Sequence, residues 1–180
     1  MTSSTEHIGR RFGAWAGAAA LTMVLGGGVA NAATTDGVTA PAATRVDWAS
    51  VVEPMLNCPK PKPKPAWYVV RARVAAVGDL TRDRRRETVV VSSCPSPTSS
   101  NPLVAFVYDG VSKPHLLGQL GKNRYFKSMK VSIRGGLVHL RGKVISDRAP
   151  RCCPDLVVSQ TYRWDGTKFR RTAEKATRIS

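Results

Sequence analysis

The chain has 180 residues, of which 28 are lysine or arginine and 12 are aspartate or glutamate, and its formal net charge is +16. This length is typical of one domain, and the positive charge favours association with polyanions. Beyond the first 32 residues no stretch is long and apolar enough to span a membrane, which excludes a second membrane-spanning segment in this chain.

The first 32 residues predict export from the cell. Arg10 and Arg11 form a short basic head, residues 12–30 carry no charge, and Ala30-Asn31-Ala32 has the small-x-small pattern of a cleavage site. This order is typical of a secretory signal peptide, cleaved after Ala32. The alternative is a retained membrane anchor, because an apolar run of this length can cross a bilayer. We expect a secreted protein, extracellular or associated with the cell envelope, whose mature chain carries a net charge of +15.

The next segments predict a tether, a short helix and a spacer. Residues 33–46 are small and polar, as in a flexible tether. Asp47 can cap a helix over residues 47–57, which Pro54 limits to about two turns. The sequence PKPKPKP at 59–65 favours an extended, solvated polyproline II spacer, the alternative being a Pro-rich ligand for a partner.

From Trp67 onward the pattern is that of short strands. In the first strand Val70, Ala72, Val74 and Ala76 fall on one face, and Arg71 and Arg73 on the other. Gly135-Gly136 and Asp165-Gly166 predict hairpin turns. The expected strands cover 67–77, 88–93, 103–110, 115–120, 127–134, 137–146, 156–164 and 167–172.

These segments predict a mainly β (or α+β) fold. We expect a small antiparallel sheet or sandwich-like domain of about eight short strands, with at most one short helix. The predicted domain, stapled by disulfides, covers 47–172, and 173–180 is expected to be a polar tail that frays.

Four cysteines of the mature chain predict two disulfides, since no pair has the spacing of a zinc site. A bond between neighbours closes a strained ring, and adjacent residues of an extended chain point to opposite faces. We therefore expect Cys152 and Cys153 to reach back separately to Cys58 and Cys94, in an order that the sequence leaves open.

The densest basic cluster is Arg82 with Arg84, Arg85 and Arg86, and it is the predicted polyanion-binding site. An alternative is a solvated loop. Oxygen-bearing side chains at 79, 81, 83 and 87 also echo a calcium loop, but Arg84 stands where that loop needs glycine, and the arginines repel a dication. Further basic residues are scattered over separate segments: Arg71, Arg73, Lys113, Arg134, Arg141, Lys143, Arg163 and Arg170.

No signature of a nucleophile elbow, a phosphate-binding glycine loop, a metal site or a carboxylate pair is present, and no cofactor is predicted. We expect a non-catalytic protein that associates with anionic wall polymer, lipid head groups or nucleic acid. One alternative is a small basic hydrolase of the ribonuclease kind, using His115 and His139 as acid and base. Another is a protease inhibitor that presents the loop CPSPTSSNP at 94–102.

Four stretches together resemble an uncharacterised family of secreted or lipid-anchored proteins of high-GC Gram-positive bacteria, akin to the LppP/LprE lipoproteins. The chain differs from this pattern in lacking a lipobox cysteine and in its run of arginines at 84–86. The resemblance implies an extracytoplasmic location and a β-rich fold, with no known activity. Its stretches are GDLTRDRRRETVVVSSC (78–94), VAFVYDG (104–110), RCCPDLVVSQTYRW (151–164) and DGTKF (165–169), and its most specific residues are Cys94, Cys152, Cys153 and Pro154.

Overall fold

The computed structural model describes residues 46–98 and 101–179. The predicted signal peptide, its cut site and the tether up to residue 45 lie outside the described residues. Within these residues the fold is mainly β, as predicted, with one short helix. The elements are α1 (Trp48–Leu56), β1 (Arg71–Gly78), β2 (Glu87–Ser93), β3 (Val104–Asp109), β4 (His115–Leu120), β5 (Tyr125–Phe126), β6 (Lys130–Arg134), β7 (Leu137–Ile145), β8 (Leu156–Trp164) and β9 (Phe169–Arg178).

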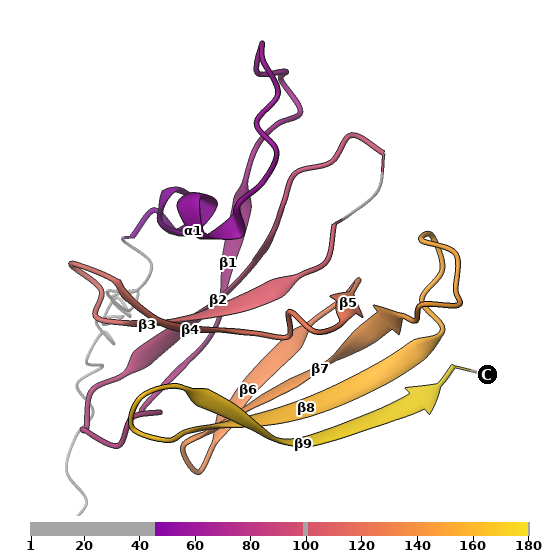
Figure 1. The fold of residues 1–180 in the computed structure, drawn as a ribbon. Helices are drawn as coiled ribbons and strands as arrows, with labels where there is room; N and C mark the ends of the chain where they lie inside the picture. The colour runs from indigo at the N-terminus through magenta and orange to yellow at the C-terminus, as the bar shows by residue number, and fades with distance from the viewer. Residues whose placement is uncertain (1–45, 99–100, 180) are drawn as a thin grey trace, which may run out of the picture. The chain divides into compact units, whose positions relative to one another are not determined.

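The strands form two antiparallel sheets (Figure 1). Sheet A has the order β1-β2-β3-β4. Sheet B has the order β5-β7-β8-β9, and β6 also pairs with β7. Hydrophobic side chains of both sheets meet in one buried core, to which Val89 and Val107 contribute from sheet A and Leu140 and Val158 from sheet B.

Helix α1 covers the other face of sheet A. Asp47 caps it by accepting from the N–H groups of Ala49 and Ser50 at 3.1 and 3.3 Å, as predicted. Its buried residues Trp48 and Val52 pack against the face of sheet A that carries Val90, Phe106 and Tyr108. The layers are therefore helix, sheet A and sheet B, and no described element covers the outer face of sheet B, which is the face turned away from sheet A.

A β-bulge interrupts the alternation of faces that the sequence predicts for β1. Val70, Ala72 and Val74 share one face as predicted, and that face packs against α1, but the pairing with β2 shifts between Val74 and Ala76. The extra residue turns Ala76 into the core between the sheets, so the prediction that Ala76 shares a face with the other three is wrong.

The C-terminal segment belongs to sheet B and is not a frayed tail. Strand β9 continues to Arg178 because β8 offers partners along its whole length, from Trp164 opposite Phe169 to Leu156 opposite Arg178. Both predicted hairpins are present, with left-handed glycines at Gly135, Gly136 and Gly166.

The disulfides join Cys58 to Cys94 and Cys152 to Cys153, and the described chain has no free cysteine. The predicted crossed arrangement is wrong. Cys58 follows α1 and Cys94 follows β2, and packing of the helix on sheet A brings their Cα atoms within 5.5 Å. Cys152 and Cys153 lie in the loop between β7 and β8 of sheet B and are bonded to each other.

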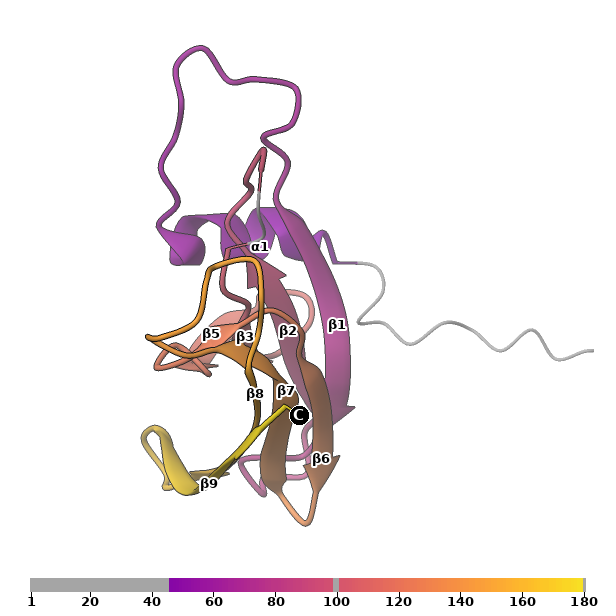
Figure 2. The ribbon, with the colours of Figure 1, turned by 90° about the vertical axis from the view of Figure 1, so that its right-hand side faces the viewer.

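The loop between α1 and β1 rises away from both sheets (Figure 2). It contains the Pro-Lys segment 59–65, whose lysines are all exposed. The chain bends at Lys62 and Pro63, so the segment is not one straight extended run.

Candidate polyanion-binding face

The arginine cluster predicted as the binding site lies in the loop between β1 and β2. Two of its residues, Arg82 and Arg84, have left-handed backbone angles, with φ of 66° and 69°. The Asp79 carboxylate stabilises this turn by accepting from both of their N–H groups, at 2.6 and 3.1 Å. Asp83 accepts from the N–H of Arg85 at 2.8 Å.

Glu87 also stabilises this loop, through hydrogen bonds from the loop backbone. Its side chain is fully buried at the start of β2 and accepts from the N–H groups of Leu80 and Thr81, at 2.5 and 3.1 Å. Burial raises the pKa of Glu87, although these two hydrogen bonds act in the opposite direction. The carboxylates that a calcium loop would need are thus bound to backbone N–H groups of the loop itself.

The loop is basic in sequence but nearly neutral in charge. Between residues 79 and 87 four arginines stand among three carboxylates. Arg85 also lies 3.8 Å from the carboxylate of Asp109, and Arg86 donates to the carbonyl oxygen of Val77. The cations are exposed, yet acidic groups neutralise most of their field.

The structure does not bring the two candidate catalytic histidines together. His115 begins β4 in sheet A, opposite Asp109 of β3. His139 lies in β7 of sheet B, and its Nδ1 is 3.1 Å from the hydroxyl of Thr161 on β8. An acid–base pair made of these two side chains is therefore not formed.

The loop proposed as protease bait is described only in part, because residues 99 and 100 lie outside the described chain. The amide of Asn101 donates to the carbonyl oxygens of Cys94 and Pro95, at 3.1 and 3.2 Å. No observation tests the inhibitor hypothesis.

A second basic region, on the outer face of sheet B, is assembled only by strand pairing. Residues directly opposite each other in antiparallel strands share a face, so each outward set of partners forms a row across the sheet. We call three of these sets the arginine row (Arg134, Leu137, Arg163, Arg170), the polar row (Ser132, His139, Thr161, Ala173) and the lysine row (Lys130, Arg141, Ser159, Lys175).

Most of the positive charge on this face has no acidic partner. Besides Arg170, its exposed basic side chains, with Lys143 next to the lysine row, are Lys130, Arg134, Arg141, Lys143, Arg163 and Lys175. Within the described chain none of these six forms an ion pair, whereas Arg170 is bound to Asp165. Glu174, the acidic residue of β9, points inward to the buried Gln160 and binds Arg124. No acidic residue of the described chain occupies an outward position of β6 to β9.

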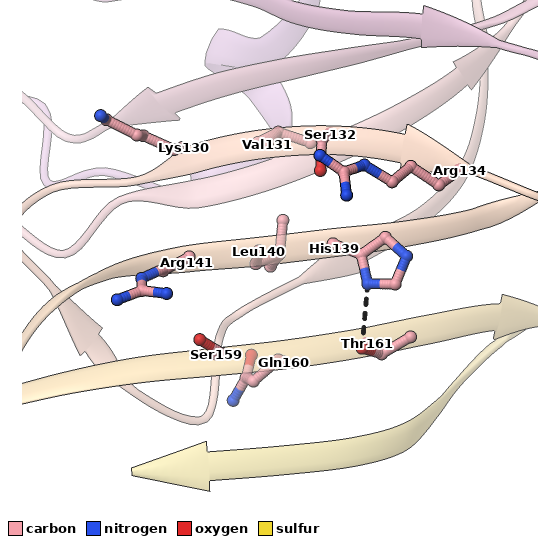
Figure 3. A pocket seen from close by; sticks show the side chains of 10 residues that line it. All are labelled: Lys130, Val131, Ser132, Arg134, His139, Leu140, Arg141, Ser159, Gln160 and Thr161. Atoms are coloured by element: carbon pink, nitrogen blue, oxygen red, sulfur yellow. Dashed lines mark hydrogen bonds between the residues drawn. The ribbon is translucent and has the colours of Figure 1, made fainter. Parts of the chain in front are cut away.

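The centre of the face is hollowed into a shallow depression of about 550 Å³ (Figure 3). Lys130 and Arg134 lie on one side of it, on β6, and Arg141 of β7 lies near Lys130. His139 lies on β7 between Arg134 and Arg141, and Thr161 lies next to it on β8, joined to it by the hydrogen bond described above. The depression therefore combines three cations with neutral polar side chains.

The sequence alone singles out most of these basic residues, but it does not show that they lie on one face of a sheet. Five of the scattered basic positions share this face, which Lys130 and Lys175 complete: Arg134, Arg141, Lys143, Arg163 and Arg170. The available signal was the alternation of basic and apolar residues in 130–134 and 137–145. By contrast, Arg71 and Arg73 lie on the edge strand β1 of sheet A, where Arg73 donates to the carbonyl oxygen of Met129 at 3.0 Å.

Comparisons with models of protein families, with curated proteins and with solved structures found no match to this chain. In the described part of the chain no helix has the length and apolar character needed to cross a membrane.

Proposed function

We propose that this chain is an exported, non-catalytic protein of the cell envelope that binds phosphate-rich polymers through the outer face of sheet B. The observation that carries the proposal is the set of six exposed, unpaired basic side chains on that face, with no acidic residue among them. Cations spaced over a rigid sheet can contact successive phosphates of one polymer and release its counterions.

The proposed location rests on sequence features. The leader ending at Ala32 and the resemblance to the LppP/LprE lipoproteins both favour the extracytoplasmic side of the membrane, where anionic polymers and lipid head groups are the available polyanions. Four cysteines joined in two disulfides fit an oxidising compartment.

Salt dependence of binding tests the proposal. We would titrate the protein with poly(glycerol phosphate), single-stranded DNA and vesicles of phosphatidylglycerol at several salt concentrations. The variant K130A/R134A/R141A and the loop variant R84A/R85A/R86A lose the same charge, so they form a matched pair. For a single-stranded polymer each lost phosphate contact flattens the slope of log affinity against log salt by about 0.7. The face variant should flatten the slope by about 2 on that basis.

The loop variant should keep the slope of the parent protein. A slope that flattens equally in both variants would mean that only net charge matters. A parent protein without salt-dependent binding to any of the three probes would refute the proposal.

A further inference from the structure

The order of the three rows on the outer face of sheet B carries information about the ligand, if the proposed function holds. The arginine row and the lysine row each hold exposed, unpaired cations, and the polar row between them holds none. In the polar row Ser132, His139 and Thr161 are all partly exposed. Hydroxyl and imidazole groups there can both donate and accept hydrogen bonds.

The distance between the basic rows follows from strand geometry. Residues of the two rows lie four positions apart along β6, β7 and β8, as Lys130 and Arg134 do on β6, and five apart along β9, where the pairing with β8 shifts. At about 3.4 Å per residue, four positions place the rows roughly 14 Å apart. A ligand that contacts both rows thus places anionic groups at each end and lays some 10 Å of its own length over neutral polar side chains.

The three rows contain no phenylalanine, tyrosine or tryptophan, and Tyr125 of β5, opposite Ile145, lies beyond them. Proteins that bind single-stranded nucleic acid combine a basic groove with aromatic side chains against which the bases stack. The cations therefore fit a phosphodiester chain, but the space between the two basic rows holds no phenylalanine, tyrosine or tryptophan on which a nucleobase could stack.

We propose that the ligand is a phosphodiester polymer whose repeating units carry hydroxyl groups, such as a polyol phosphate or a sugar phosphate. Phosphates of non-adjacent units lie over the arginine and lysine rows, because a single glycerol unit is too short to span the distance between them. Hydroxyl groups of the units between these phosphates exchange hydrogen bonds with Ser132, His139 and Thr161, across the depression that these side chains line. Inorganic polyphosphate would satisfy the basic rows but has no hydroxyl group for the polar row.

The test compares poly(glycerol phosphate) with inorganic polyphosphate of equal charge on the exported protein and two variants. S132A/T161V removes two hydroxyl groups of the polar row and keeps every charge. Thr177→Val removes an exposed hydroxyl of β9 outside the three rows and serves as the control. S132A/T161V should weaken binding of poly(glycerol phosphate) roughly fivefold to tenfold, as expected for two neutral hydrogen bonds, and change polyphosphate affinity less than twofold. Thr177→Val should change neither affinity.

The outcomes separate this inference from the proposed function. If S132A/T161V leaves poly(glycerol phosphate) binding unchanged, or weakens both polymers equally, the inference is overturned, while loss of binding in K130A/R134A/R141A would still uphold the proposed function. If neither polymer binds the parent protein, both fail. Circular dichroism and thermal midpoints equal to those of the parent would show that each variant folds.

Discussion

The loop between β1 and β2 and the outer face of sheet B are both rich in arginine and lysine, but their charges are arranged in opposite ways. In the loop, carboxylates that shape the backbone stand among the cations, and Asp109 adds another. On the sheet, Glu174 is the acidic residue of β6 to β9, and its carboxylate points inward. A local run of arginines therefore does not by itself create a surface of uncompensated positive charge, whereas strand register can bring unpaired cations to one face.

In sheet B, a substitution at Gly142 is expected to reduce the stability of the fold most. Gly142 lies in β7, where the backbone of Ser128 passes so close that a Cβ atom would stand 1.8 Å from its carbonyl oxygen. Gly142→Ala should destabilise the fold by about 3 kcal/mol, the upper end for overpacking, because backbone and not a movable side chain must shift.

Urea unfolding measures this effect, and Gly118→Ala in β4 is the matched control. A Cβ at Gly118 would meet the ring of Phe169 at 3.2 Å, and a ring can move aside. Equal loss of stability in the two variants would contradict the close approach at Ser128.

In the loop between β1 and β2, Glu87 is the residue whose substitution is expected to reduce stability most. Glu87→Ala leaves the N–H groups of Leu80 and Thr81 without their acceptor, and Leu80 is itself buried. We expect a loss of about 2 kcal/mol in the free energy of unfolding, within the range for unsatisfied buried donors. Asp83→Ala removes an exposed carboxylate from the same loop and should cost less than about 0.5 kcal/mol. A larger loss for Asp83→Ala would mean that the surface carboxylates hold the loop.

Local patterns predicted the elements because each depends on nearby residues. Asp47 caps α1, glycines form the hairpin turns, and alternation marks the strands. What the sequence did not predict depends on pairing between distant segments. The bulge that turns Ala76, the bond between Cys58 and Cys94, and the extent of β9 are all set by partners elsewhere in the chain.

The candidate face is the clearest example of this limit. Alternation alone indicates that Arg134 and Arg141 are outward in their own strands, but it gives no register between those strands. The pairing of Lys130 with Arg141, and of Leu137 with Arg163, is what brings the cations together. A single sequence contains no direct signal for such pairing, so the arginine run of the loop appeared to be the stronger site.

Charge reversal at one position in each region sharpens the comparison. In water two unit charges 4 Å apart interact by about 1 kcal/mol, and reversal both removes an attraction and adds a repulsion. Arg141→Glu should therefore weaken binding of poly(glycerol phosphate) by about 2 kcal/mol, or about thirtyfold, at low salt. Arg85→Glu carries the same change of charge beside Asp109 and should weaken binding less than about threefold, a long-range effect screened by salt. A greater effect of Arg85→Glu would move the binding site back to the loop.

The smallest predicted effect is a dependence of stability on pH that arises from Glu87. Burial raises its pKa above the ordinary value of 4.5, so between these two values the folded chain binds a proton that the unfolded chain has released. The contribution of Glu87 is therefore fully present below about pH 4.5 and is lost as pH rises through the raised pKa. Glu87→Gln cannot titrate, and because all other groups are shared, the stability of the parent relative to this variant should fall with rising pH over that window. Urea unfolding from pH 4 to pH 8 measures the difference, and a parent protein that gains stability over the variant as pH rises would show that the hydrogen bonds from Leu80 and Thr81 outweigh burial.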